Sequence, residues 1–267
     1  MKVRLAVPDA ACLSPLVYEL DKPESSFELV RDFPSSVALK FAQRADALRA
    51  AFVSPIDYAR HGADYCIVPG IAAASSTRTD TVRLFVRRET RDIRTLAGDI
   101  RVTSEIILAK IILLERIENI TVDRSLQFIP MFPDLSQMLQ KADAALVVEL
   151  NSPASTPADT FSLDLVEEWY DMTGLPYVHG FWIGREEEFS QNELDALVNA
   201  RDRGTAFIDR IAQDLAAKHH RPTAELQKYL SSFSYELGTT EQESVTEYTR
   251  YAYFHGVIGD IPELRFF

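Results

Sequence analysis

The segment Gly98–Arg116, GDIRVTSEIILAKIILLER, joins a short polar loop to a long apolar run, and Thr103 and Ser104 stand where the two meet. A hydroxyl just before an apolar run is typical of a helix N-cap, which stabilises a helix by about 1 kcal/mol. The start of a helix also presents free N–H groups and a partial positive charge, which suit a carboxylate. The two roles are compatible, so the segment predicts a helix over 103–118, capped by hydroxyls, and raises the question of a ligand at its start.

Strands and helices alternate on both sides of this segment. Short apolar or alternating runs predict strands, and apolar residues at helical spacing predict helices. We expect strands at 2–7, 26–33, 48–55, 64–76, 81–88, 93–99, 126–131, 144–150 and 176–184, and helices at 14–20, 34–45, 103–118, 134–142 and 165–173. Residues 152–162 are rich in Pro and Ser and read as a loop, and three helical segments follow Ser190.

This alternation predicts an α/β protein whose sheets are mixed but mostly parallel and are covered by helices on both faces. In such sheets, ligands bind beyond the carboxyl ends of the strands. The polar loops at those ends are therefore the candidate binding segments. They are residues 9–12, Ser54, and residues 75–81, 99–104 and 151–155.

The composition is that of an ordinary globular protein: of 267 residues, 46% are hydrophobic and 25% are charged. No run of eighteen apolar residues occurs, so we expect no helix in a membrane. The first residues, MKVRLAVPD, lack the apolar core of a signal peptide, so we expect a cytoplasmic location. The two cysteines, Cys12 and Cys66, lack metal-ligand spacing and do not suggest a disulfide scaffold.

The formal net charge of −12 disfavours a nucleic-acid partner, because such binding depends on neutralising phosphates. A small anionic ligand remains compatible with this charge, since local donors decide a buried site. Five histidines are scattered along the chain without a metal-binding pattern, and there is no glycine-rich phosphate loop. We therefore expect neither a metal nor a cofactor.

Individual residues leave alternatives open. Cys12 is either a nucleophile or a small buried apolar residue, and no histidine lies near it in sequence to activate it. Most of the arginines between residues 78 and 101 are expected at the surface, although Arg78 or Arg101 at a strand end could clamp a carboxylate. Trp169 and Trp182 fit the core better than a ligand platform.

Several long stretches together resemble one family. They are SPLVYEL (14–20), FVSPIDYARHGADYCIVPGIAAAS (52–75), TVRLFVRR (81–88), TSEIILAKIILLER (103–116), MFPDLSQMLQKADAAL (131–146), LVEEWYDMTGLPYV (165–178) and the tail from Phe233 to Phe267. The chain resembles the chorismate dehydratases of the futalosine route to menaquinone. Those enzymes have a two-lobe fold similar to type II periplasmic binding proteins.

The resemblance implies a first lobe of residues 1–86 plus 179–267, which includes the C-terminal helices, and a second lobe of residues 87–178. A ligand cleft would lie between the lobes and close on a dicarboxylate. The implied reaction removes water from chorismate to give 3-[(1-carboxyvinyl)oxy]benzoate. The aromatic residues of the tail fit either the core or the interface of a homodimer.

Residue by residue, the match to the family's site is partial. Cys12 stands where the family has an asparagine at its catalytic centre, and Thr81 stands where it has a serine. Thr103 and Ser104 match the family's hydroxyl loop, whereas Glu149 and Leu150 replace a glycine and an aspartate. We therefore expect Cys12 and Thr81 at the catalytic centre. The expected ligand-binding residues are Ser54, Arg78, Arg101, Thr103, Ser104 and Asn151.

Two other functions remain open. A diverged member of the family would bind a small carboxylate as a sensor or carrier, without turnover. A related enzyme of the same superfamily would form 1,4-dihydroxy-6-naphthoate.

Overall fold

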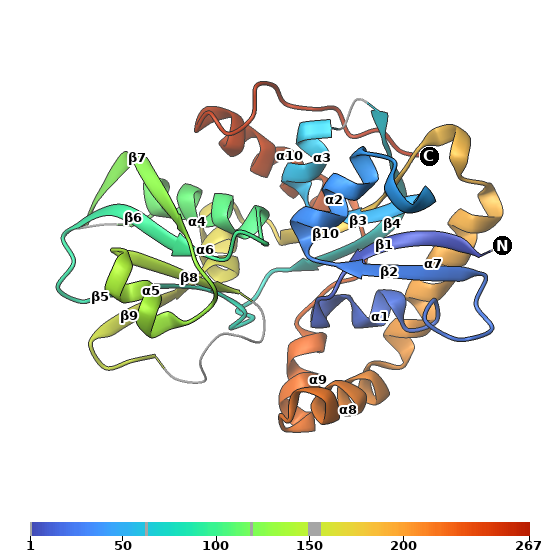
Figure 1. Cartoon of the computed structure of the whole chain (residues 1–267), viewed down its shortest axis with the longest axis horizontal. Helices are drawn as coiled ribbons and strands as arrows, with labels where there is room; N and C mark the ends of the chain where they lie inside the picture. Colours follow the sequence, from blue (N-terminus) through green and yellow to red (C-terminus); the bar gives the residue numbers. More distant parts are fainter. Residues whose placement is uncertain (1, 62–63, 118–119, 149–155) are drawn as a thin grey trace.

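The computed structural model describes residues 2–61, 64–117, 120–148 and 156–267. The chain forms two lobes, each built on a five-stranded sheet with helices packed on it (Figure 1). Glu149, Leu150 and Asn151 lie outside the described residues. None of the helices in the described ranges is both long enough and apolar enough to cross a bilayer.

The sheet of the first lobe contains β1 (Val3–Pro8), β2 (Phe27–Asp32), β3 (Ala50–Val53), β4 (Cys66–Ser75) and β10 (Tyr177–Gly184), in the order β2-β1-β3-β10-β4. β1 runs parallel to β2 and β3, whereas β10 runs antiparallel to β3 and β4. Side chains alternate across β1, so that Leu5 and Val7 face one core and Ala6 faces the other.

The sheet of the second lobe contains β5 (Val82–Arg87), β6 (Asp92–Gly98), β7 (Thr121–Pro130), β8 (Ala144–Val148) and β9 (Thr160–Asp164), in the order β7-β6-β8-β5-β9. β6 runs parallel to β7 and β8, and β5 runs antiparallel to β8 and β9. Both sheets are thus mixed, with less parallel pairing than the alternation predicted, because the strand that follows each crossover enters its new sheet antiparallel.

The helices are α1 (Ser14–Val17), α2 (Pro34–Ala42), α3 (Pro55–His61), α4 (Ser104–Glu115), α5 (Leu135–Lys141), α6 (Leu165–Thr173), α7 (Gln191–Ala206), α8 (Ile208–His219), α9 (Thr223–Ser231) and α10 (Thr239–Phe254). Residues of α1 and α7–α9 share one core of the first sheet, and residues of α2, α3 and α10 share the core on its other face. In the second lobe, α4 and α6 lie on one face and α5 lies on the other.

Four sequence expectations change. The chain crosses to the second sheet before β5, not after residue 86, because β5 is hydrogen-bonded to β8 and β9. The return falls before β10, so residues 177–178 pair with β4 in the first sheet. Residues 160–164 form the edge strand β9, although the sequence predicts a loop over 152–162. The region after Ser190 holds four helices instead of three, since Phe207 leaves helical geometry between α7 and α8.

Helix α10 packs against both lobes. Its residue Val245 belongs to a core of the first lobe, whereas Tyr248 and Ala252 pack in the main core of the second. Ser244 on the same helix accepts a hydrogen bond from the indole N–H of Trp169 in α6 at 3.2 Å. The C-terminal helix therefore fixes the relative position of the two sheets.

Candidate functional site

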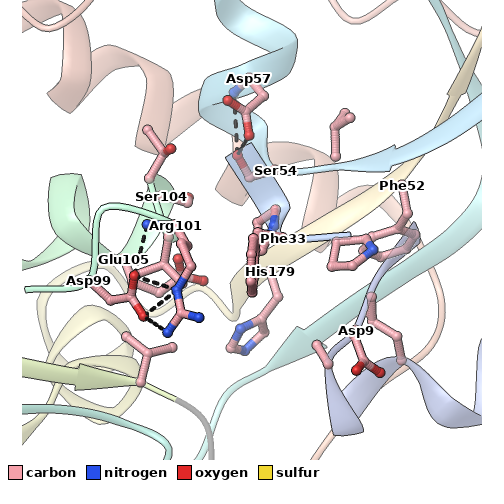
Figure 2. A pocket seen from close by; sticks show the side chains of 18 of the residues that line it. Asp9, Phe33, Phe52, Ser54, Asp57, Asp99, Arg101, Ser104, Glu105 and His179 are labelled. Carbon is pink, nitrogen blue, oxygen red and sulfur yellow. Dashed lines mark hydrogen bonds and ion pairs between the residues drawn. The ribbon is translucent and has the colours of Figure 1, made fainter. Parts of the chain in front are cut away.

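A cavity of about 220 Å³ lies between the two lobes, at the carboxyl ends of β1, β3, β6 and β8. Its wall from the first lobe includes Asp9, Cys12, Phe33, Ser54, Asp57 and His179, and its wall from the second lobe includes Asp99, Arg101, Thr103, Ser104 and Glu105 (Figure 2). This is where the rule for strand ends predicts a ligand.

The structure brings five of the predicted site residues to this cavity and leaves two elsewhere. Cys12, Ser54, Arg101, Thr103 and Ser104 all line it. Of the three others, Asn151 lies outside the described residues.

Thr81 and Arg78 are not in the cavity wall. Thr81 is buried in the crossover to β5, where its hydroxyl donates to Thr79 Oγ1 at 2.9 Å. Arg78 is half exposed and pairs with Asp80 at 2.7 Å and with Glu167 at 3.8 Å. Both residues stand at the carboxyl end of β4, but the crossover leads them towards β9 and α6, where the N–H groups of Thr79 and Asp80 bind Asp164.

The start of α4 is not capped by a hydroxyl, contrary to the sequence prediction. Thr103 is the N-cap residue, but its backbone has φ −98° and ψ −47° and its side chain makes no capping bond. An N-cap hydroxyl normally needs an extended backbone to reach the next N–H groups. The first helical bond runs from Ile107 N–H to Thr103 O, so the N–H groups of residues 104–106 lie ahead of the helical ladder.

Ser104 instead joins a buried cluster of hydroxyls between the lobes. Its Oγ lies 2.9 Å from the hydroxyl of Tyr177 and donates to the hydroxyl of Tyr248 at 3.1 Å, while Tyr248 donates to the Ser104 carbonyl at 2.8 Å. Because the single proton of Ser104 goes to Tyr248, Tyr177 must be the donor in the third bond. Burial raises the pKa of both tyrosines, which keeps them protonated.

Arg101 supplies the positive charge of the cavity wall, and its guanidinium forms an ion pair with Asp99. The Arg101 Nε lies 2.8 Å from both carboxylate oxygens of Asp99. Burial tends to raise the pKa of Asp99, but the hydrogen bonds from Arg101 outweigh it and the net shift is downwards. The guanidinium also stacks on Phe33, 4.5 Å from the ring centre. The backbone carbonyl of Arg101 accepts a hydrogen bond from the Ser35 N–H at 3.2 Å. These contacts join the lobes at the rim of the cavity.

Ser54 and Asp57 form a closed pair at the start of α3. The Ser54 hydroxyl donates to Asp57 Oδ2 at 2.6 Å, and the Asp57 N–H donates back to Ser54 Oγ at 3.3 Å. Burial raises the pKa of Asp57, and the hydrogen bond from Ser54 opposes that rise. Asp57 is not among the residues predicted for the site, although its spacing of three residues after Ser54 is a recognisable helix-start signal.

His179 is a second cavity residue that is not among those predicted from the sequence. It lies on β10 between the rings of Tyr177 and Phe233, whose centres are 4.8 and 5.1 Å from its own. Its Nε2 is 2.8 Å from Ser75 Oγ. Burial lowers the pKa of His179 from 6.5 to about 3, so the imidazole is neutral at physiological pH. A lone histidine in an otherwise apolar strand was its only signal.

The wall as a whole carries more negative than positive side chains. Asp9, Asp57, Asp99 and Glu105 face a single arginine, Arg101, which is already paired. Within the described ranges, no three His, Cys, Asp or Glu residues are grouped to hold a metal ion. An anion in this cavity must therefore be held mainly by N–H groups at the start of α4 and by neutral donors.

Replacing Tyr248 with Phe removes the acceptor of the Ser104 proton and the donor to the Ser104 carbonyl. We expect the free energy of unfolding to fall by about 2 kcal/mol, because buried polar groups lose their partners. Urea denaturation measures the change. Tyr253→Phe is the matched control, since Tyr253 is half exposed and should change stability by less than about 0.5 kcal/mol. Equal losses of unfolding free energy in Tyr248→Phe and Tyr253→Phe would contradict the role of the hydroxyl cluster.

His179 also predicts a dependence of stability on pH. Since its folded pKa of about 3 lies below the ordinary 6.5, the unfolded chain binds the proton better. The free energy of unfolding should therefore fall as the pH drops from 6.5 towards 3, by up to about 1.4 kcal/mol for each pH unit. In His179→Gln, the free energy of unfolding should fall less steeply between pH 6 and pH 4 than in the wild type. An unchanged slope in the variant would show that His179 is not the group responsible.

Comparison with known proteins gives a family and a fold. A family model described as menaquinone biosynthesis matches residues 3–254. Among solved structures, the chain is similar to protein AF1704 from Archaeoglobus fulgidus, with 16% identity, a TM-score of 0.75 and coverage of 96% of this chain and 98% of that one.

The chain is also similar to the periplasmic aliphatic sulphonate binding protein SsuA from Escherichia coli, with 12% identity, a TM-score of 0.66 and coverage of 98% of this chain and 90% of that one. A protein described as an ABC transporter from Parabacteroides distasonis matches with 13% identity, the same TM-score, and coverage of 99% and 98%. At these identities the similarity establishes the fold alone. The predicted two-lobe, periplasmic-binding-protein-like fold is confirmed.

Proposed function

The chain belongs to the menaquinone-biosynthesis family, as its resemblance to the chorismate dehydratases predicted, and from this premise we propose that it removes water from chorismate to give 3-[(1-carboxyvinyl)oxy]benzoate. The observation that carries the proposal is the cavity between the lobes, at the carboxyl ends of the strands and in front of α4. Its size and position suit a small carboxylate ligand.

In this proposal the carboxylate on the ring of chorismate lies at the start of α4. The N–H groups ahead of the helical ladder point out of the helix end, and the helix dipole favours negative charge there. The hydroxyl of Thr103, which makes no hydrogen bond within the described part of the chain, is available as a further donor. Arg101 stabilises the same end of the ligand from the rim, although Asp99 takes up much of its charge.

The reaction requires loss of a ring proton and of the ring hydroxyl, and formation of the aromatic ring drives it. The protein's part is to orient the carboxylates and to stabilise the hydroxyl as it leaves. The walls of both lobes surround the cavity, which limits water around the ligand. Neutral donors suit the leaving oxygen, because its charge is small in the bound substrate and grows only in the transition state.

Cys12 favours a second candidate, a binding protein that holds a small carboxylate without turnover. The thiol is 3% exposed and packs in the apolar core of the first lobe. A thiol is a weak donor and acceptor, so it cannot reproduce the hydrogen bonds of the amide that the family resemblance places there. An enzyme like those that form 1,4-dihydroxy-6-naphthoate is a third candidate, and no contact in the cavity favours it over the first.

Purified protein incubated with chorismate should yield the enolpyruvyl benzoate, detected by chromatography with mass detection. Thr103→Val should lower kcat/KM by about tenfold, the value of one hydrogen bond of roughly 1.4 kcal/mol. Thr121→Val is the matched control, because Thr121 is an exposed residue of β7 outside the cavity wall.

The absence of product from folded wild-type protein would contradict the lyase. Saturable binding of chorismate without product would then support the binding protein.

A further inference from the structure

The geometry of β10 sets His179 apart from the rest of the strand. Val178 pairs with Ala74 of β4 and Gly180 pairs with Ala73, so the register shifts at His179. A bulge of this kind re-aims a side chain and is common beside binding sites. His179 accordingly leaves the sheet surface and lines the cavity, where Figure 2 shows its ring between Arg101 and Asp9.

Gly180 makes this placement possible. A Cβ at this position would lie 2.5 Å from Phe52 Cε1 and 2.6 Å from the Val53 carbonyl. The backbone of β10 therefore approaches β3 more closely than any other residue would allow. The bulge at His179 and the close approach at Gly180 together place the imidazole in the cavity wall.

Ser75 determines which nitrogen of His179 carries the proton. The Ser75 hydroxyl is 2% exposed, and His179 Nε2 is its partner at 2.8 Å. Since no other side-chain bond of this hydroxyl occurs within the described residues, its proton goes to Nε2. A neutral imidazole that accepts at Nε2 carries its own hydrogen on Nδ1. Nδ1 has no partner in the described part of the chain, so this N–H is available to a ligand in the cavity.

The other neutral side-chain donors of the cavity wall are largely committed. The proton of Ser54 goes to Asp57, and that of Ser104 goes to Tyr248. The thiol of Cys12 is a weak donor. Thr103 remains, but it stands at the start of α4 together with the N–H groups that suit a carboxylate. A second polar group of the ligand, away from α4, therefore meets His179.

We propose that His179 contacts the substrate directly and that its Nδ1–H donates a hydrogen bond to the ring hydroxyl that leaves. This inference rests on the proposed dehydration and names the group that stabilises the departing oxygen. The imidazole keeps its proton, and its part is to polarise the carbon–oxygen bond as that bond breaks. The carbon–oxygen pair leaves with the oxygen, the ring C–H pair becomes the new ring double bond, and the released ring proton joins the departing hydroxide to give water. The aromatic rings of Tyr177 and Phe233 and the hydrogen bond to Ser75 hold the imidazole in place before the substrate binds.

Two substitutions separate this role from a structural one. The amide of His179→Asn lies near the position of Nδ1 and keeps the donor that faces the cavity, whereas the amide of His179→Gln lies near Nε2 and keeps the partner of Ser75. We expect kcat to fall by less than about fivefold in the Asn variant and by roughly 100-fold in the Gln variant, the loss measured for one such donor elsewhere. Equal losses in both variants, or no loss in the Gln variant, would overturn the proposal.

A binding measurement tests the same contact without turnover and without a substitution. The probes are 4-hydroxybenzoate, which carries a hydroxyl opposite its carboxylate as chorismate does, and benzoate, which lacks that hydroxyl. In the NMR spectrum of wild-type protein with ¹⁵N-labelled histidine, the Nδ1 signal of His179 should move with the first ligand and stay with the second. Equal shifts, or none at saturation, would overturn the contact.

The outcomes also separate this inference from the proposed function. If the wild-type protein turns over chorismate and the His179→Gln variant is fully active, the role of His179 is contradicted and the dehydratase activity is supported. Folded wild-type protein that gives no product would remove the dehydratase, and this role of His179 would fall with it.

Discussion

The hydroxyl cluster of Ser104, Tyr177 and Tyr248 is the interaction on which the site depends. Each member comes from a different part of the fold: α4 of the second lobe, β10 of the first, and the C-terminal helix α10. Buried hydroxyls must find partners, so these three elements can pack together only in the arrangement that satisfies all of them. That arrangement places the start of α4 against the first lobe. The residues at the start of this helix, Thr103, Ser104 and Glu105, then line the cavity.

The chemistry of the cavity follows from the charges and donors that this packing places in its wall. Its carboxylates outnumber its arginine, and Arg101 is held by Asp99 and stacked on Phe33. Binding of an anion therefore depends on the direction of N–H groups more than on side-chain charge, as in other helix-terminus sites. The bulge in β10 adds a neutral imidazole to the opposite wall. The wall thus offers two kinds of donor, one suited to a carboxylate and one suited to a neutral oxygen.

Much of the fold could be predicted because burial imposes a period on the sequence. The strand around Leu5 and the helix from Ser104 both follow from their apolar patterns, and the strand-end rule singles out Cys12, Ser54 and Arg101, which line the cavity. The errors arise where partners distant in sequence decide the outcome. Ser104 looks like a cap until Tyr177 and Tyr248 take up its hydroxyl, and Thr81 looks like a site residue until the crossover turns it towards Thr79. His179 could not be found from periodicity, since a bulge removes it from the alternation that reveals strand residues.

A crystal structure of the protein with 3-[(1-carboxyvinyl)oxy]benzoate would test the central claim most directly. We expect the benzoate to lie in the cavity between the lobes, with its ring carboxylate within hydrogen-bond distance of the Ser104 N–H group and of the Thr103 hydroxyl. A ligand bound outside this cavity, or one whose carboxylates both turn away from α4, would contradict it.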